Sequence, residues 1–182
     1  MSEQTAISWT EATWNPTTGC DRVSPGCANC YALAMAKRLK AAGNPRYQKD
    51  GGPASGPGFG LTVHPDLLDL PLRWRKPRLV FVNSMSDLFH EDVPDAFIEQ
   101  VFITMARRVE GHRKRGWEGP LPFDHPPYPL PNVWLGVSVE NQRQTWRIDE
   151  LLRCPAVVHF ISGGRLLDGR TWDEVPDGGR LT

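Results

Sequence analysis

Apolar residues recur along this chain with two different periods, and the alternation between them predicts both helices and strands. Residues 31–43 carry apolar side chains every three or four positions, with lysine and arginine between them, which is typical of an amphipathic helix. A stronger apolar stripe of the same period follows a proline over residues 95–109. Shorter helices are predicted over residues 66–74 and 140–152.

Continuous apolar runs predict the strands. They occupy residues 79–83, 133–139 and 156–161, and a shorter strand is expected within residues 1–19. Runs that are apolar on both faces are typical of parallel strands covered by helices. The sequence therefore predicts the α/β class, a parallel sheet with flanking helices, in one domain over residues 1–162.

Three segments break these patterns. Residues 50–60 are rich in glycine and proline and predict a surface loop without a catalytic role, and residues 111–131 predict a second irregular stretch. Residues 163–182 show little apolar periodicity and predict an extended C-terminal tail.

Composition narrows the class of protein. The chain has 182 residues, of which 40% are hydrophobic and 23% charged, enough to bury one core. Its formal net charge is zero, so charge does not indicate a nucleic-acid partner. Neither a leader-like start nor a membrane-spanning apolar run is present, which predicts a cytoplasmic protein without membrane association.

The cysteines carry the clearest chemical signal. Cys20, Cys27 and Cys30 stand at C-x6-C-x2-C spacing immediately before the first predicted helix. In a reducing compartment, clustered cysteines favour metal ligation over disulfides. Three thiolates can hold three irons of a [4Fe–4S] cluster and leave the fourth iron open to a small molecule.

The sequence also offers two alternative metal sites. Structural zinc would need a fourth ligand such as His64 or Cys154, and zinc sites favour paired C-x2-C units, of which the chain has one. Asp87, His90 and Glu91 suggest a second metal site, but polar residues at this spacing usually face solvent. The iron–sulfur interpretation is preferred.

Polar side chains follow two of the predicted strands, where ligands gather in parallel α/β folds. The candidate cofactor-binding residues are Asn83, Ser84, Ser86 and Asp87 after one strand, and Ser138, Glu140 and Asn141 after the next. The alternative is that Asp87, Ser138 and Asn141 only cap helices.

Several segments together resemble a known family, the phage-associated three-cysteine-motif proteins of bacteriophages, a radical-SAM-like group without established function. The resemblance rests on residues 9–16, 19–31, 72–77, 82–90 and 132–141. It implies a TIM-like barrel of the radical-SAM type, a [4Fe–4S] cluster on the three cysteines and S-adenosylmethionine at the open iron.

The chain departs from that pattern in two ways. Its spacing differs from the C-x3-C-x2-C of radical-SAM enzymes, and Asn29 stands where those enzymes commonly carry an aromatic residue. Family segments after residue 109 and after residue 162 are missing, which implies an internally deleted member with a partial barrel. Missing strands expose sheet edges and predict a partner protein that covers them.

Two function classes follow. The first is a radical-SAM-like iron–sulfur protein of unknown substrate, active or inactive through its missing segments. The second is a non-enzymatic module that binds zinc or a structural cluster, or that binds another protein.

Overall fold

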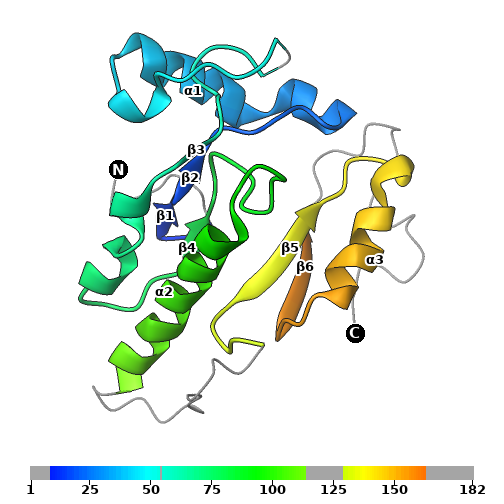
Figure 1. Cartoon of the computed structure of the whole chain (residues 1–182). Helices are drawn as coiled ribbons and strands as arrows, with labels where there is room; N and C mark the ends of the chain where they lie inside the picture. The colour runs from blue at the N-terminus through cyan, green and yellow to red at the C-terminus, as the bar shows by residue number, and fades with distance from the viewer. Residues whose placement is uncertain (1–8, 54, 114–128, 163–182) are drawn as a thin grey trace. The chain divides into compact units, whose positions relative to one another are not determined.

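The computed structural model describes residues 9–53, 55–113 and 129–162 (Figure 1). Backbone contacts divide the chain into two compact units, Met1–Glu118 and Gly119–Thr182. The tail predicted for residues 163–182 lies outside the described residues, as does most of the irregular stretch predicted over residues 111–131. One domain over residues 1–162 stays a prediction.

Two short strand pairs build the centre of the first unit. β1 (Ala12–Trp14) pairs in parallel with β4 (Val80–Val82), and β2 (Thr17–Thr18) pairs antiparallel with β3 (Thr62–Val63). Threonine, valine and aromatic residues favour such pleated segments. The strand predicted over residues 79–83 and the one expected before residue 19 are thus confirmed.

A long helix covers the β1–β4 pair. α2 (Asp95–Arg113) begins after Pro94, whose carbonyl accepts a hydrogen bond from the Phe97 N–H at 2.8 Å. Its residue Val101 is fully buried beside Trp14. Phe97, Ile98, Phe102 and Met105 pack against the same core. The amphipathic helix predicted after Pro94 is confirmed.

A second core forms under the first helix. α1 (Tyr31–Ala41) buries Ala32 and Ala36 against Tyr47, Phe59 and Met85. Since Cys20 and Cys30 pack against this cluster, the helix that follows the cysteines also anchors them. The helix predicted from residue 31 is confirmed.

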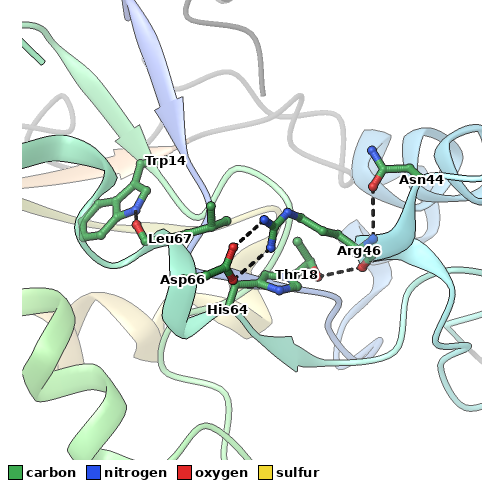
Figure 2. A network of polar contacts seen from close by, with 7 residues as sticks. All are labelled: Trp14, Thr18, Asn44, Arg46, His64, Asp66 and Leu67. Atoms are coloured by element: carbon green, nitrogen blue, oxygen red, sulfur yellow. Dashed lines mark hydrogen bonds and ion pairs between the residues drawn. The ribbon is translucent and has the colours of Figure 1, made fainter. Parts of the chain in front are cut away.

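The helix predicted over residues 66–74 is instead two separate 3-10 turns. They are η3 (Pro65–Leu67) and η4 (Leu70–Arg73). Pro71 has no N–H to donate, so it cannot continue an α-helix from the residues before it. The Leu67 carbonyl accepts a bond from Trp14 Nε1 at 2.8 Å, which ties η3 to the buried indole (Figure 2).

The second unit is a strand–helix–strand element. β5 (Trp134–Ser138) and β6 (Val158–Ser162) pair in parallel, joined through η5 (Gln142–Gln144) and α3 (Trp146–Arg153). Figure 1 shows α3 lying alongside the pair. Both strands were predicted, and the helix predicted over residues 140–152 is instead the 3-10 turn η5 followed by the shorter helix α3. The residues of β5, however, are alternately exposed and partly buried, and Trp134 is 61% exposed. The prediction that both faces of this strand are buried is therefore wrong.

Among the described strands, β1 with β4 and β5 with β6 pair in parallel and β2 with β3 pairs antiparallel, and the α/β class with one parallel sheet stays a prediction. A partial barrel stays a prediction. Within the part of the chain that the structure describes, no helix has the length and apolar character needed to cross a membrane.

Candidate metal centre

The three clustered cysteines line one pocket of about 110 Å³ in the first unit. The other lining residues are Asp21, Arg22, Ala32, Leu33, Phe59, Ser84 and Ser86. Cys20, Cys27 and Cys30 are all partly buried and form no disulfide. The structure therefore brings the predicted metal ligands together with two of the predicted cofactor-binding residues, Ser84 and Ser86.

Local backbone structure sets the cysteines in place. Cys27 lies within η1 (Pro25–Asn29), and its N–H donates to the Ser24 carbonyl at 3.1 Å. Cys30 is the N-cap residue of α1, and its N–H donates to the Cys27 carbonyl at 3.2 Å. The tight turn thus links the second and third cysteines directly to the helix that packs beside the pocket.

Gly19 lets the chain pass closely behind Cys20. Its φ of +85° lies in the left-handed region, and a Cβ atom here would stand 2.4 Å from the Gly60 carbonyl carbon. Its N–H donates to the Met85 carbonyl at 3.0 Å. Gly19 therefore joins the Cys20 segment both to the loop after β4 and to the segment that contains Phe59.

Asn83 opens the loop after β4 in a left-handed conformation, with φ of +59°. Its N–H donates to the Trp14 carbonyl at 2.9 Å, and its Nδ2 donates to Thr17 Oγ1 at 2.6 Å. Asn83 Oδ1 is buried and has no hydrogen-bond partner among the described residues. Asn83 does not line the pocket, so it acts on the site by fixing the turn that carries Ser84 and Ser86.

Asp87 does not cap a helix, because no helix begins there; its Oδ1 instead accepts a bond from the Phe89 N–H at 2.9 Å and stabilises a turn. It also acts on the thiols electrostatically. Burial, and after it the carboxylate of Asp87, raises the pKa of Cys20 to about 11. Without a cation this thiol is protonated at neutral pH and is a poor nucleophile. A bound metal ion would stabilise the thiolate instead.

Asp21, the residue after Cys20, is held from two sides. Its Oδ1 accepts a bond from Ser55 Oγ at 3.1 Å, and its Oδ2 lies 3.4 Å from His90 Nε2. The His90 Nδ1 accepts the Asp92 N–H at 3.1 Å, which leaves the proton of a neutral ring on Nε2. His90 thus contacts Asp21, and the described residues contain no metal-ligand group of His90 with Asp87 and Glu91.

As predicted, the described part of residues 50–60 holds no helix or strand, but this loop lies only partly at the surface. Phe59 is 4% exposed and lines the pocket, and Ser55 is buried and binds Asp21. Gly51, Gly58 and Gly60 of this segment are closely packed, whereas a Cβ at Gly52 or Gly56 would meet no atom within 4 Å. Asp21 and Arg22 were also missed as lining residues, although their position beside Cys20 was a signal for them.

The three thiols match a metal cluster in the type of donor they supply. Three thiols on one pocket supply the donors that iron–sulfur clusters use. Within the described ranges, no three His, Cys, Asp or Glu side chains stand close enough to share one metal ion. Four ligands of a tetrahedral zinc ion lie only about 4 Å apart, since each zinc–sulfur bond is about 2.3 Å long. Each thiolate of a cluster binds a different iron, which requires wider spacing.

The two proposed fourth zinc ligands lie elsewhere. His64 is buried, with Nε2 2.8 Å from Thr18 Oγ1, and it does not line the pocket (Figure 2). Burial, and next the positive charge of Arg46, lowers the His64 pKa. Arg46 itself pairs with Asp66 at 2.6 Å. Cys154 belongs to the second unit, where its Sγ donates to the Glu150 carbonyl at 3.5 Å.

The second predicted polar cluster lies wholly in the second unit. Arg147 Nη1 donates to the Ser138 carbonyl at 2.9 Å and to Glu140 Oε2 at 3.1 Å. Asn141 caps η5, because its Oδ1 accepts the Arg143 N–H at 2.9 Å. The Asn141 amide oxygen is therefore used for capping, and the Glu140 carboxylate for an internal ion pair.

Comparison with known protein families identifies the family of this chain. A family model described as "Protein of unknown function (DUF5131)" matches residues 4–163. The chain matches no curated protein and no solved structure.

Proposed function

The chain belongs to the DUF5131 family, and we propose that it is a radical-SAM-like iron–sulfur protein that holds a [4Fe–4S] cluster on Cys20, Cys27 and Cys30. S-Adenosylmethionine is the proposed ligand of the open iron. The resemblance to the phage-associated three-cysteine-motif family, and with it a partial TIM-like barrel, is part of this proposal. The substrate class is left open.

The observation that carries the proposal is the convergence on one pocket of residues far apart in sequence. Cys20, Cys27 and Cys30 line it from one segment, and Ser84 and Ser86 line it from the loop after β4. Thiols alone would suit a structural metal. Hydroxyl groups beside them give a ligand of the metal polar contacts, as small-molecule sites require.

The protein's own groups would divide the work. When bound, such a cluster supplies an open iron for the ligand and a one-electron reductant for its sulfonium. Ser84 and Ser86 would orient the ligand's polar groups, while Phe59 and Leu33 would exclude water from that side. The contacts of Asp21 with Ser55 and His90 would fix the position of its carboxylate beside the pocket.

A second candidate function, a protein-interaction module, is favoured by the apolar surface of the second unit. Trp134 and Phe160, on the paired strands β5 and β6, are 61% and 37% exposed. Large exposed apolar side chains are frequent at protein interfaces. The proposed partner is a protein that covers this sheet. The proposal also places the protein in the cytoplasm, where its four cysteines, none of which forms a disulfide, stay reduced.

The test is anaerobic reconstitution of the full chain with iron and sulfide, followed by visible and EPR spectra with and without S-adenosylmethionine. We expect about four irons per chain, thiolate-to-iron absorption, and an EPR signal of the reduced cluster that changes when the ligand is added. Cys27→Ala should lose the cluster and Cys154→Ala should keep it. A folded, colourless wild-type protein, or stoichiometric zinc, would refute the proposal.

A further inference from the structure

Two cationic segments that lie far apart in sequence come together in the first unit. One precedes β4 and the other stands near the C-terminal end of α2. Arg108 Nη2 donates to the Lys76 carbonyl at 2.9 Å, and α2 packs against η4, the turn that leads into the first segment. We call this surface the basic patch, and its residues are Arg73, Arg75, Lys76, Arg78, Arg107 and Arg108.

A buried tryptophan holds the first segment in place. Trp74 is 9% exposed and belongs to the core that α2 covers, and its backbone is extended. Neighbouring side chains of an extended segment point to opposite sides, so burial of Trp74 turns Arg73 and Arg75 outward, and both are exposed. The Arg78 guanidinium carbon lies 5.6 Å from the centre of the Trp74 ring, a cation–π contact. The core therefore fixes where these cations stand.

Positive charge is concentrated in the basic patch although the chain as a whole has no net charge. The sequence contains no acidic residue between Leu70 and Ser86, and none between Gln100 and Val109. Glu11 lies at the edge of the patch, where its Oε2 accepts a hydrogen bond from the Leu79 N–H at 2.8 Å. Like charges held close together repel one another, and an anionic partner would relieve that repulsion.

The basic patch lies at the opposite end of β4 from the cysteine pocket. Arg78 precedes this strand, whereas Ser84, which lines the pocket, follows it. Figure 1 shows the C-terminal end of α2 pointing away from α1, the helix that follows the cysteines. The patch therefore needs a role of its own, separate from that of the thiols.

The composition of the basic patch favours phosphate as the anion. Arginine predominates, and its planar guanidinium donates two parallel hydrogen bonds to a phosphate group. The backbone of a nucleic acid presents phosphates in a regular row, so several cations can be neutralised at once. A membrane surface fits less well, because amphipathic helices bind membranes through an exposed apolar face, whereas the apolar face of α2 packs on the core.

We propose that the basic patch binds the sugar–phosphate backbone of a nucleic acid without reading its sequence. Arg73, Arg75, Lys76 and Arg107 are exposed and contact the phosphates. Arg108 holds the two segments together through the Lys76 carbonyl. This inference goes beyond the proposed iron–sulfur function and does not depend on it.

The test is the salt dependence of binding, measured by fluorescence anisotropy as the full chain is titrated into a labelled DNA duplex of mixed sequence. Cations that bind phosphates release counterions, so four contacts predict a slope of about −3 to −4 for the logarithm of the affinity against the logarithm of the salt concentration. The same strand without its complement should give a shallower slope. Protein with and without a reconstituted cluster should bind alike.

Variants then assign the binding to the basic patch. Arg73→Gln/Arg75→Gln should weaken binding by roughly tenfold or more at about 0.1 M salt and make the slope shallower by about 2. Lys37→Gln/Arg38→Gln is the matched control, because it removes two exposed cations from α1 and changes the net charge equally. It should leave the slope unchanged. Glu11→Gln, which removes the carboxylate at the edge of the patch, should tighten binding.

Several results would overturn the proposal. One is a lack of salt-dependent binding to DNA. Another is equal weakening by both double variants, since binding would then follow net charge rather than the patch. Binding to vesicles that contain phosphatidylserine, without binding to DNA, would assign the patch to a membrane surface instead. Tighter binding by Glu11→Gln cannot result from unfolding, so it supports the proposal even if a double variant is destabilised.

Discussion

The ends of β4 and β5 begin from the same sequence pattern and reach different structures. Each strand is followed by a short run of polar residues, Asn83 to Asp87 in one case and Ser138 to Asn141 in the other. After β4, two serines line a pocket with three thiols. After β5, Arg147 binds both the Ser138 carbonyl and the Glu140 carboxylate.

A turn that can bind a ligand differs in this way from a closed turn, in which the polar groups bind one another. A polar cluster binds a ligand only if some hydrogen-bonding capacity is left facing a cavity. The oxygens of Ser84 and Ser86 keep such capacity, whereas the main interactions of Glu140 and Asn141 lie within their own strand–helix element. Four predictions test this distinction, from the largest effect to the smallest.

Gly19→Ala should disrupt the first strand end most severely. The new Cβ would stand 2.4 Å from the Gly60 backbone at φ of +85°, and we expect more than about 4 kcal/mol of lost stability in urea unfolding. Gly43→Ala is the matched control, because Gly43 also has a positive φ but no atom within 4 Å. It should cost only about 1–2 kcal/mol. Equal losses would show that the Gly19–Gly60 contact does not matter.

Arg147→Ala should disrupt the second strand end. It removes the guanidinium that pairs with the Glu140 carboxylate at 3.1 Å, and the Glu140 side chain is only 10% exposed. Breaking a buried ion pair lowers the free energy of unfolding by about 3 kcal/mol at the lower end of the known range. The loss is measured by thermal unfolding. The double variant Arg147→Ala/Glu140→Gln should recover part of this loss. If the single variant is as stable as the wild type, the closed turn is not held by Arg147.

Glu140→Gln alone should leave the affinity for S-adenosylmethionine unchanged, unlike Ser84→Ala. A fall in affinity equal to that of the serine variant would place both strand ends at the ligand and would remove the contrast between them.

His64, which contacts Thr18 of β2, gives the smallest effect, a dependence of stability on pH. Burial lowers its folded-state pKa below the ordinary value near 6.5, so its contribution to stability is present above that pH and is lost as pH falls through the folded pKa. Arg46 and Asp66 are the charged groups that act on it, and Asp66 titrates at lower pH. His64→Gln should flatten the stability profile just below pH 6.5 in urea titrations. An unchanged profile would assign the loss to other groups.

The sequence predicts those elements that depend on interactions between residues close together along the chain. Helices α1 and α2 and strands β4, β5 and β6 were predicted because their apolar periods are local. The role of Asn15 was not predicted, because its Oδ1 accepts hydrogen bonds from Ser84 and Met85, which lie about seventy positions away in sequence.

The pocket itself was only half predictable. The cysteine spacing identified the candidate ligands, and the position after a strand identified Ser84 and Ser86. Phe59 was missed because a glycine-rich segment usually indicates an open loop, while here its glycines permit close packing. The same positional rule, applied to Glu140 and Asn141, does not show that Arg147 and Arg143 bind them.

The most direct test of the central claim, that Cys20, Cys27 and Cys30 hold a cluster with one open iron, is Mössbauer spectroscopy of the iron-57-reconstituted protein. We predict one iron whose parameters change when S-adenosylmethionine is added, while the other three keep theirs. Four equivalent irons that ignore the ligand, or no cluster iron in folded protein, would contradict the account.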